Sequence, residues 1–312
     1  MPAHHDIPAT PDVLVFGVFE PGRAPVLEIA SGDEVTLHSL PAGGRSCLHP
    51  DPARVPAELR AALDAHDAAP GPHFVTGPIH VRGAEPGDVL QIDILDVRCR
   101  LDWGSVSILP LLGTLPDEFT EYETIHAEID AARGVAVLPW GRALPLAPFF
   151  GILATQPPRI WGPVTTPVPR AFGGNMDNKE LRAGATLYLP VFEPGAGFYA
   201  GDGHALQGDG EVCITALETA LTGTFRLTVR KDLGYAWPFA ETPTDLMTIG
   251  LHESLDEAMR QAVREMVRHV CGRTGLTRNQ AYMLASLAGN LRITQTVDGN
   301  KGVHMLMPKT AL

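Results

Sequence analysis

Glycine and proline interrupt this chain so often that long helices have little room before residue 250. The 312 residues include 32 Gly and 28 Pro, which favour turns and break helices. Short apolar stretches lie between the turns, and residues 90–94 and 225–229 alternate apolar with polar side chains. Because successive side chains of a strand point to opposite faces, this alternation predicts half-buried strands. The chain is therefore expected to be mainly β.

The strongest helical periodicity lies near the C-terminus. Ser254 and Glu257 have the spacing of a capping box, in which two side chains satisfy free backbone N–H groups. Apolar residues then recur at helical spacing towards Gly272, which is expected to end the helix. A second helix is expected to begin at Thr277, followed by a strand over residues 291–295.

This order of elements predicts a β-sandwich or distorted barrel with a smaller α+β portion. Residues 1–232 are expected to form a β-rich core that holds the site. Residues 233–312 are expected to form an α+β portion packed on that core, or to join it in one composite domain. A short helix is also expected over residues 56–67.

The charge of the chain excludes several classes of partner. It carries 36 acidic and 24 basic residues, a net charge of -12 at pH 7. Nucleic acid and anionic membrane surfaces require clustered Lys and Arg. No apolar stretch approaches the roughly 20 residues of a membrane span, and the first residues do not resemble a signal peptide. We expect a cytoplasmic protein with a small-molecule substrate and with no nucleic-acid or membrane partner.

Several familiar catalytic motifs are missing from the sequence. The cysteines, Cys47, Cys99, Cys213 and Cys271, are far apart and form no C-x-x-C pair, so neither a disulfide framework nor a zinc knot is expected. Cys213 has no adjacent basic residue to activate its thiol. There is no G-x-S-x-G motif and no Gly-rich phosphate loop.

The densest group of polar residues lies between residues 173 and 211. Glycines stand beside several of the acids and the histidine, and glycine permits unusual backbone angles and the close approach of a ligand. In an extended chain Asp202 and His204 point to one face. The candidate site residues of this segment are Asn175, Asp177, Asp202, His204, Gln207 and Glu211.

Imidazole and carboxylate groups are typical ligands of a catalytic metal ion, which needs few protein ligands and one open position. Each acid taken alone is better explained by an ordinary turn, since Asp in Gly-Asp-Gly often bonds its own backbone. Two such loops on either side of one strand favour a functional site. Among the other histidines, His5, His73, His252 and His269 are expected to be solvated or structural.

Four segments of this region resemble signatures of the acetamidase/formamidase family: residues 173–181, 186–191, 201–205 and 207–212. The resemblance implies hydrolysis of formamide, acetamide or a related small aliphatic amide to the carboxylate and ammonia. It also implies a jelly-roll-like β-sandwich with an additional β-barrel and a C-terminal α+β portion. A divalent metal ion, and a homodimer or larger even homo-oligomer, are further expectations from the resemblance.

The resemblance assigns Asp177, Asp202 and His204 as metal or water ligands. Zinc is favoured over calcium because the set includes an imidazole. In this interpretation, metal-activated water attacks the amide.

The other candidate residues take roles in proton transfer and substrate binding. Glu211 is expected as the acid/base, and Asn175 and Gln207 as groups that orient the substrate carbonyl. Two alternatives remain: a lactamase that acts on a cyclic amide, and a non-catalytic β-sandwich that binds a small molecule.

Two positions depart from the family pattern. Phe172 stands where the family often has His, which removes a possible ligand or proton carrier. Asn290 stands where the family usually has Asp, which removes a negative charge. If position 290 belongs to the site, Asn290→Asp should change the pH profile or substrate preference. If it only ends a helix, neither should change.

Overall fold

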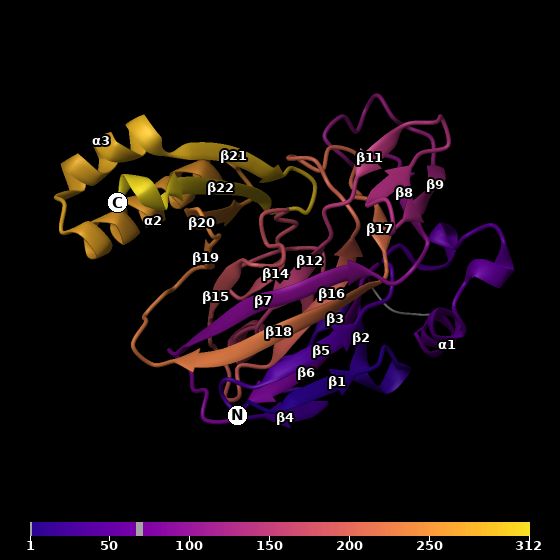
Figure 1. The fold of residues 1–312 in the computed structure, drawn as a ribbon, viewed down its shortest axis with the longest axis horizontal. Helices are drawn as coiled ribbons and strands as arrows, with labels where there is room; N and C mark the ends of the chain where they lie inside the picture. Colours follow the sequence, from indigo (N-terminus) through magenta and orange to yellow (C-terminus); the bar gives the residue numbers. More distant parts are fainter. Residues whose placement is uncertain (1, 67–70) are drawn as a thin grey trace.

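Two large β-sheets form the framework of residues 2–66 and 71–312, the part of the chain that this computed structural model describes (Figure 1). The nine-stranded sheet has the order β1 (His4–Ile7), β5 (Glu34–His38), β18 (Leu221–Arg230), β7 (Val89–Cys99), β15 (Thr186–Pro190), β19 (Phe239–Glu241), β20 (Asp245–His252), β22 (Lys301–Pro308) and β21 (Asn290–Gln295).

The eleven-stranded sheet has the order β11 (Ala143–Pro145), β10 (Val135–Val137), β9 (Glu123–Asp130), β8 (Trp103–Ile108), β17 (Glu218–Thr219), β16 (Phe198–His204), β12 (Phe149–Ala154) and β14 (Gly173–Asn175). A branch adds β6 (Phe74–Val81), β2 (Leu14–Phe16) and β4 (Leu27–Ile29), and a separate pair joins β3 (Val18–Phe19) to β13 (Val164–Thr165). Short 3-10 turns are η1 (Pro11–Val13), η2 (Gly44–Cys47), η3 (Pro52–Arg54), η4 (Arg159–Trp161) and η5 (Lys309–Ala311).

The largest apolar core lies between the two sheets. Strands β7, β15 and β18 of one sheet and β6, β12 and β16 of the other contribute to a single cluster of buried side chains. The ring of Phe225 lies 5.4 Å from the rings of both Phe150 and Phe198, across the sheets. Burial of each large apolar side chain contributes roughly 1.5–3 kcal/mol, so this cluster holds the sheets together. The predicted mainly β sandwich is confirmed.

The expected β-barrel part is an open sheet. Among the described residues neither large sheet closes, because β1 and β21 end one, and β11 and β14 end the main path of the other. The second sheet branches at β16, which pairs with β6 near Phe198 and with β17 near His204. This branch opens the sheet at the end of β16, where the candidate residues lie.

The C-terminal helices cover one face of β20 and β22. In α2 (Leu255–Thr274), Ala258, Ala262, Met266 and Val270 form a buried stripe at the spacing of a helix face. Gly275, not Gly272, ends this helix, because Gly275 has the left-handed backbone (φ 72°) of a helix exit.

The two C-terminal helices differ in how their first turns are capped. Ser254 precedes α2, but its side chain makes no capping hydrogen bond. Thr277 and Gln280 form a complete capping box at the start of α3 (Arg278–Ala288). Helix α1 spans Ala57–Ala65, and the expected end at residue 67 lies outside the described residues.

The nine-stranded sheet runs from the N-terminal part into the C-terminal part without a break. Strand β15 pairs with β7 on one side and with β19 on the other. We therefore propose that residues 1–232 and 233–312 form one composite domain. In the described part of the chain no helix has both the length and the apolar character of a membrane span. All four cysteines are free.

Candidate functional site

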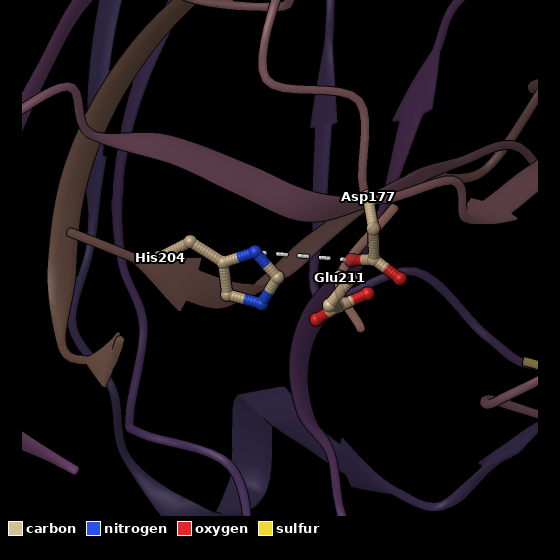
Figure 2. Close-up of side chains that lie close together, drawn as sticks. All are labelled: Asp177, His204 and Glu211. Carbon is tan, nitrogen blue, oxygen red and sulfur yellow. Dashed lines mark ion pairs between the residues drawn. The ribbon is translucent and has the colours of Figure 1, made fainter. Parts of the chain in front are cut away.

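A cavity of about 510 Å³ lies beside the end of β16. One part of its wall is polar and buried, and is formed by Asn175, Asp202, His204, Glu211, Glu218 and Asp298. Figure 2 shows Asp177 and Glu211 next to the ring of His204. The structure thus brings together residues that are up to 123 positions apart, between Asn175 and Asp298.

Strand β16 and its neighbours fix the central side chains. Asp202 and His204 lie two residues apart on β16, so both point to the same face, as predicted. Glu218 lies directly opposite His204 on the paired strand β17. The edge of the Phe149 ring packs against the His204 imidazole, with 5.0 Å between ring centroids.

Three acids of the cluster lie on an unusual backbone. Asp177, Asp202 and Glu211 have positive φ values of 48°, 58° and 43°. Such backbone is sparsely populated for residues other than glycine, and it recurs at functional sites. It turns each carboxylate inward, where burial is nearly complete.

Gly151 leaves the space that these side chains occupy. It lies on β12 between residues that pair with β16, and its carbonyl accepts the backbone N–H of Asp177 at 3.2 Å. A Cβ at position 151 would lie 2.3 Å from Asp177 Oδ1 and 2.4 Å from Asp202 Oδ2. Only glycine permits both carboxylates to lie against this strand.

His204 is the centre of the polar cluster. Its Nε2 lies 3.2 Å from Asp202 Oδ2 and 3.3 Å from Glu218 Oε1. Its Nδ1 lies 2.9 Å from Gln207 Oε1 and 3.9 Å from Asp177 Oδ1.

The Gln207 amide fixes the role of each imidazole nitrogen. Gln207 Nε2 donates to the Asp177 carbonyl oxygen at 2.8 Å, so its Oε1 must face His204. Because Oε1 can only accept, His204 Nδ1 carries the proton that it accepts. Nε2 is then the nitrogen that is directed at Asp202 and Glu218, and it is the one suited to bind a cation.

Many buried oxygens of the cluster have no hydrogen-bond partner among the described residues. They are Asn175 Oδ1, both carboxylate oxygens of Asp177, Asp202 Oδ1, Glu211 Oε2, Glu218 Oε2 and Asp298 Oδ2. Buried carboxylates are costly unless they are paired or bind a metal ion. Two groups of residues each place their ligand atoms within 4.8 Å of one another. One consists of Asp177, His204 and Glu211, and the other of Asp202, His204 and Glu218. These residues fit a divalent cation.

Burial and mutual repulsion raise the pKa values of several carboxyl groups in the cluster. Burial and the charge of Asp202, partly offset by the charge of His204, raise the pKa of Glu218 to about 7 and that of Asp177 to about 6. Burial, with the charge of Asp177, raises the pKa values of Glu211 and Asp298 well above the ordinary range. Several carboxyl groups can therefore hold a proton near neutral pH when no cation is bound.

Two groups of the cluster keep their charge despite burial. Burial opposes ionisation of Asp202, but the charges of His204 and His73 hold its pKa below the usual range. Burial likewise opposes protonation of His204, but Glu218 and Asp202 hold its pKa well above the usual value. The two residues therefore stabilise each other as an ion pair.

All six candidate residues belong to this cluster or contact it, although Asp177 and Gln207 are not among the residues that line the cavity. The Gln207 amide is engaged by His204 and Asp177 instead. Asp209, which also belongs to the acidic loop, points elsewhere and pairs with Lys179 at 3.1 Å.

Sequence reasoning missed Glu218, Asp298 and His73. Glu218 is the single acid among the mostly apolar residues 216–221. An acid isolated in this way could have marked it in the sequence as a candidate site residue. His73 was expected to be solvated or structural; it is buried, lines the cavity, and its Nδ1 lies 2.9 Å from Thr166 Oγ1. His269 is structural as predicted, with its ring stacked on Phe239 at 3.9 Å.

Asp298 ties the C-terminal portion to the site. It lies between β21 and β22, next to a parallel bridge between Gly210 and Gln295. The N–H of Gly210 donates to the Thr294 carbonyl at 3.0 Å. The loop that carries Glu211 is therefore held by the C-terminal hairpin.

Phe172 lies in an apolar cluster away from the cavity lining. It is fully buried, and its ring packs edge-on against that of Phe19 with 5.5 Å between centroids. A large apolar side chain fits this environment, so the change from His has a packing explanation.

Asn290 begins β21 with an exposed side chain and is not among the cavity-lining residues. We therefore expect Asn290→Asp to leave the pH profile and the substrate preference of the protein unchanged. Rates measured on an amide panel from pH 6 to 9 would check this. A shifted pH profile would show that position 290 acts on the site.

Gln207 offers a direct test of the imidazole arrangement. Gln207→Leu removes the acceptor of His204 Nδ1–H, and we expect it to weaken cation binding about 10–100-fold, the usual cost of losing such a partner. Titration against a chromophoric chelator measures the affinity. Gln207→Glu keeps an acceptor and should retain more affinity, whereas equal affinities in all three proteins would contradict the assigned role.

Comparison with known sequences gives one family. The sequence model of the Acetamidase/Formamidase family matches residues 25–160 and 162–311. A formamidase of Methylophilus methylotrophus is 30% identical, with 47% of this chain and 49% of that protein covered. The chain spans about half the length of the curated relatives it matches.

Solved structures are similar over nearly the whole chain. A predicted acetamidase/formamidase of the thermophile Thermoanaerobacter tengcongensis has 28% identity and a TM-score of 0.87, over 99% of this chain and 97% of that one. An acetamidase of Bacillus halodurans has 30% identity and a TM-score of 0.83, over 97% of both chains.

Proposed function

This chain belongs to the acetamidase/formamidase family, and on that premise we propose that it is an amidase. It hydrolyses the carbon–nitrogen bond of a small aliphatic amide to the carboxylate and ammonia. The observation that carries this proposal is the buried cluster of His204 and carboxylates at the wall of a cavity. Amide hydrolysis needs an activated water, a stabilised oxyanion and a protonated leaving nitrogen, and this cluster contains groups suited to each.

The cation site that the geometry favours consists of Asp202, His204 Nε2 and Glu218. Asp202 Oδ2 and Glu218 Oε1 lie 3.2 Å and 3.3 Å from His204 Nε2, whereas Nδ1 is engaged by Gln207. Glu218 thus takes the ligand position first expected for Asp177. When bound, the cation supplies Lewis acidity and lowers the pKa of water.

Proton transfer and substrate orientation fall to the remaining groups of the wall. Burial raises the pKa of Glu211 above its usual range, which favours its role as the group that takes up and returns a proton, as a general acid/base must. Asn175 lines the same cavity, and its amide N–H donates to the substrate carbonyl. Gln207 acts as a positioning residue that orients His204.

We propose zinc rather than calcium as the metal. One imidazole with two carboxylates leaves an open position, which is the usual zinc arrangement in hydrolases. Calcium takes six to eight oxygen ligands and seldom an imidazole. Elemental analysis of protein purified without chelator tests this, and stoichiometric calcium with no zinc would contradict it.

The test of function is ammonia release by the metal-loaded protein. Formamide, acetamide and propionamide should be hydrolysed, with γ-lactams as the comparison for ring opening. Turnover of lactams alone would identify a lactamase. No turnover of any of them, with zinc and calcium supplied in turn, would identify a binding protein.

We also propose a homodimer or larger even oligomer assembled through α3 and β21. Strand β21 ends the nine-stranded sheet, and edge strands readily pair with another strand. Large apolar side chains are exposed beside it, among them Met283, Leu287, Leu291 and Ile293, with Leu287 86% exposed. Pairing with a second copy would cover them on both chains. Sedimentation of a 33.4 kDa monomer alone would contradict this.

A cytoplasmic location is part of the same proposal. The four free cysteines suit a reducing compartment. Localisation of the tagged protein by fractionation checks it.

A further inference from the structure

The cavity is much larger than a substrate such as acetamide, which has four non-hydrogen atoms. Its volume of about 510 Å³ lies within the range of pockets that enclose ligands of drug size. Most of the wall beyond the polar cluster is apolar. Leu109, Leu112, Val168, Ile214 and Val297 contribute to it.

These apolar residues come from four separate loops. Leu109 and Leu112 follow β8, Val168 precedes β14, Ile214 follows β16, and Val297 lies between β21 and β22. Apolar side chains that four loops bring together around one cavity indicate a ligand-binding surface. Contiguous apolar surface exposed to water is unfavourable unless a ligand or partner covers it.

The charge of the lining selects against anionic substrates. Asp202, Glu211, Glu218 and Asp298 are acidic, and no Lys or Arg stands among the described lining residues. An acyl group with its own carboxylate would place that charge along the apolar wall, where no Lys or Arg of the described lining is available to pair with it. A neutral acyl group would meet only apolar contacts.

The turn after β16 joins the polar and apolar parts of the wall. Glu211 and Ile214 both line the cavity, and the Ile214 N–H donates to the Glu211 carbonyl at 3.1 Å. Ile214 has a φ of 84°, which is a rare conformation for a β-branched residue. Backbone strain of this kind recurs where a side chain must point into a functional site.

We infer that the preferred substrate is a neutral primary amide whose acyl group is apolar and larger than acetyl. The inference rests on the proposed amidase function and names its substrate class. The amide lies at the polar cluster, and the acyl chain lies along the side chains of Leu109, Val168, Ile214 and Val297.

A chain-length series tests the inference with the metal-loaded protein. From acetamide through butyramide to hexanamide, kcat/KM should rise by roughly threefold to fourfold for each methylene that is buried. Succinamic acid, which carries a carboxylate on a similar chain, should be a poorer substrate than butyramide by at least about tenfold.

Variants of the apolar wall provide the second test. Val168→Phe and Val297→Phe fill the space for the acyl chain, and each should lower the ratio of hexanamide to acetamide kcat/KM by about tenfold. Val212→Phe is the matched control, because Val212 is 63% exposed and does not line the cavity. It should leave the ratio unchanged.

The two proposals can fail separately. If formamide or acetamide is the best substrate and kcat/KM falls with chain length, the inference is overturned and the amidase function stands. If no amide is hydrolysed, the amidase function fails, and calorimetric titration decides the ligand class. Tighter binding of hexanamide than of acetamide then supports the inference, and equal or absent hexanamide binding overturns it.

Discussion

Gly151→Ala is expected to abolish cation binding and to lower amidase activity by at least about a hundredfold, while the protein stays folded. The new Cβ would lie 2.3 Å from Asp177 Oδ1, 2.4 Å from Asp202 Oδ2 and 2.8 Å from His204 Cε1. Contacts that short force the side chains apart. Displacements near 1 Å at a reacting centre already cost about a hundredfold in rate.

Gly234→Ala is the matched control for this change. Gly234 has open space around its Cβ position and no left-handed backbone, so alanine should fit there. Elemental analysis, ammonia release and far-ultraviolet circular dichroism measure cation content, activity and fold. A folded Gly151→Ala protein with full cation content and wild-type activity would show that the cluster is arranged differently.

Removal of the cation is expected to abolish activity and to make stability strongly dependent on pH. The folded metal-free protein holds extra protons, because Asp177, Glu211, Glu218 and Asp298 have raised pKa values. The unfolded chain releases those protons near pH 4. The metal-free protein should therefore lose stability as pH rises from about 4 through the folded values of about 6 and about 7 for Asp177 and Glu218.

Other groups of the cluster do not reverse this trend. The raised pKa of His204 stabilises the folded protein at low pH and loses effect as pH rises, in the same direction. The lowered pKa of Asp202 acts in the opposite direction, but its effect is complete near pH 4–5. The combined loss in the free energy of unfolding amounts to several kcal/mol, because each unit of pKa shift is worth about 1.4 kcal/mol.

Thermal unfolding from pH 5 to pH 8 measures this effect. The Tm of the metal-free protein should fall by at least about 5 °C over this range. The cation-loaded protein should change less, because a bound cation favours the ionised carboxylates. Parallel pH dependence of the two forms, or full activity after chelation, would contradict a cation at these residues.

Sequence patterns predicted the architecture well where local physics decides it. The alternation over residues 90–94 appears as buried Leu90, Ile92 and Ile94 on β7, and Thr277 forms its capping box. The end of α2 was misplaced because Gly272 and Gly275 both lie near it, and only the folded backbone shows which one is left-handed.

The site was predictable in part, for a similar reason. Asp202 and His204 share a strand, so spacing alone places them together. Glu218 faces His204 through strand pairing, which no local spacing reveals. Gly151 has no side chain and therefore no chemical signature, although its lack of a Cβ makes room for two carboxylates.

The C-terminal hairpin forms part of the cavity wall, because Val297 and Asp298 lie between β21 and β22. It also holds the loop that carries Glu211, through the hydrogen bond from the Gly210 N–H to the Thr294 carbonyl. A nascent chain that has not been extended past this hairpin has an open, unsupported pocket, even though His204, Glu211 and Glu218 have long been synthesised. On the proposed function, turnover is thus expected only after synthesis has passed this hairpin. C-terminal truncation before the hairpin should leave an inert polypeptide rather than a weaker enzyme.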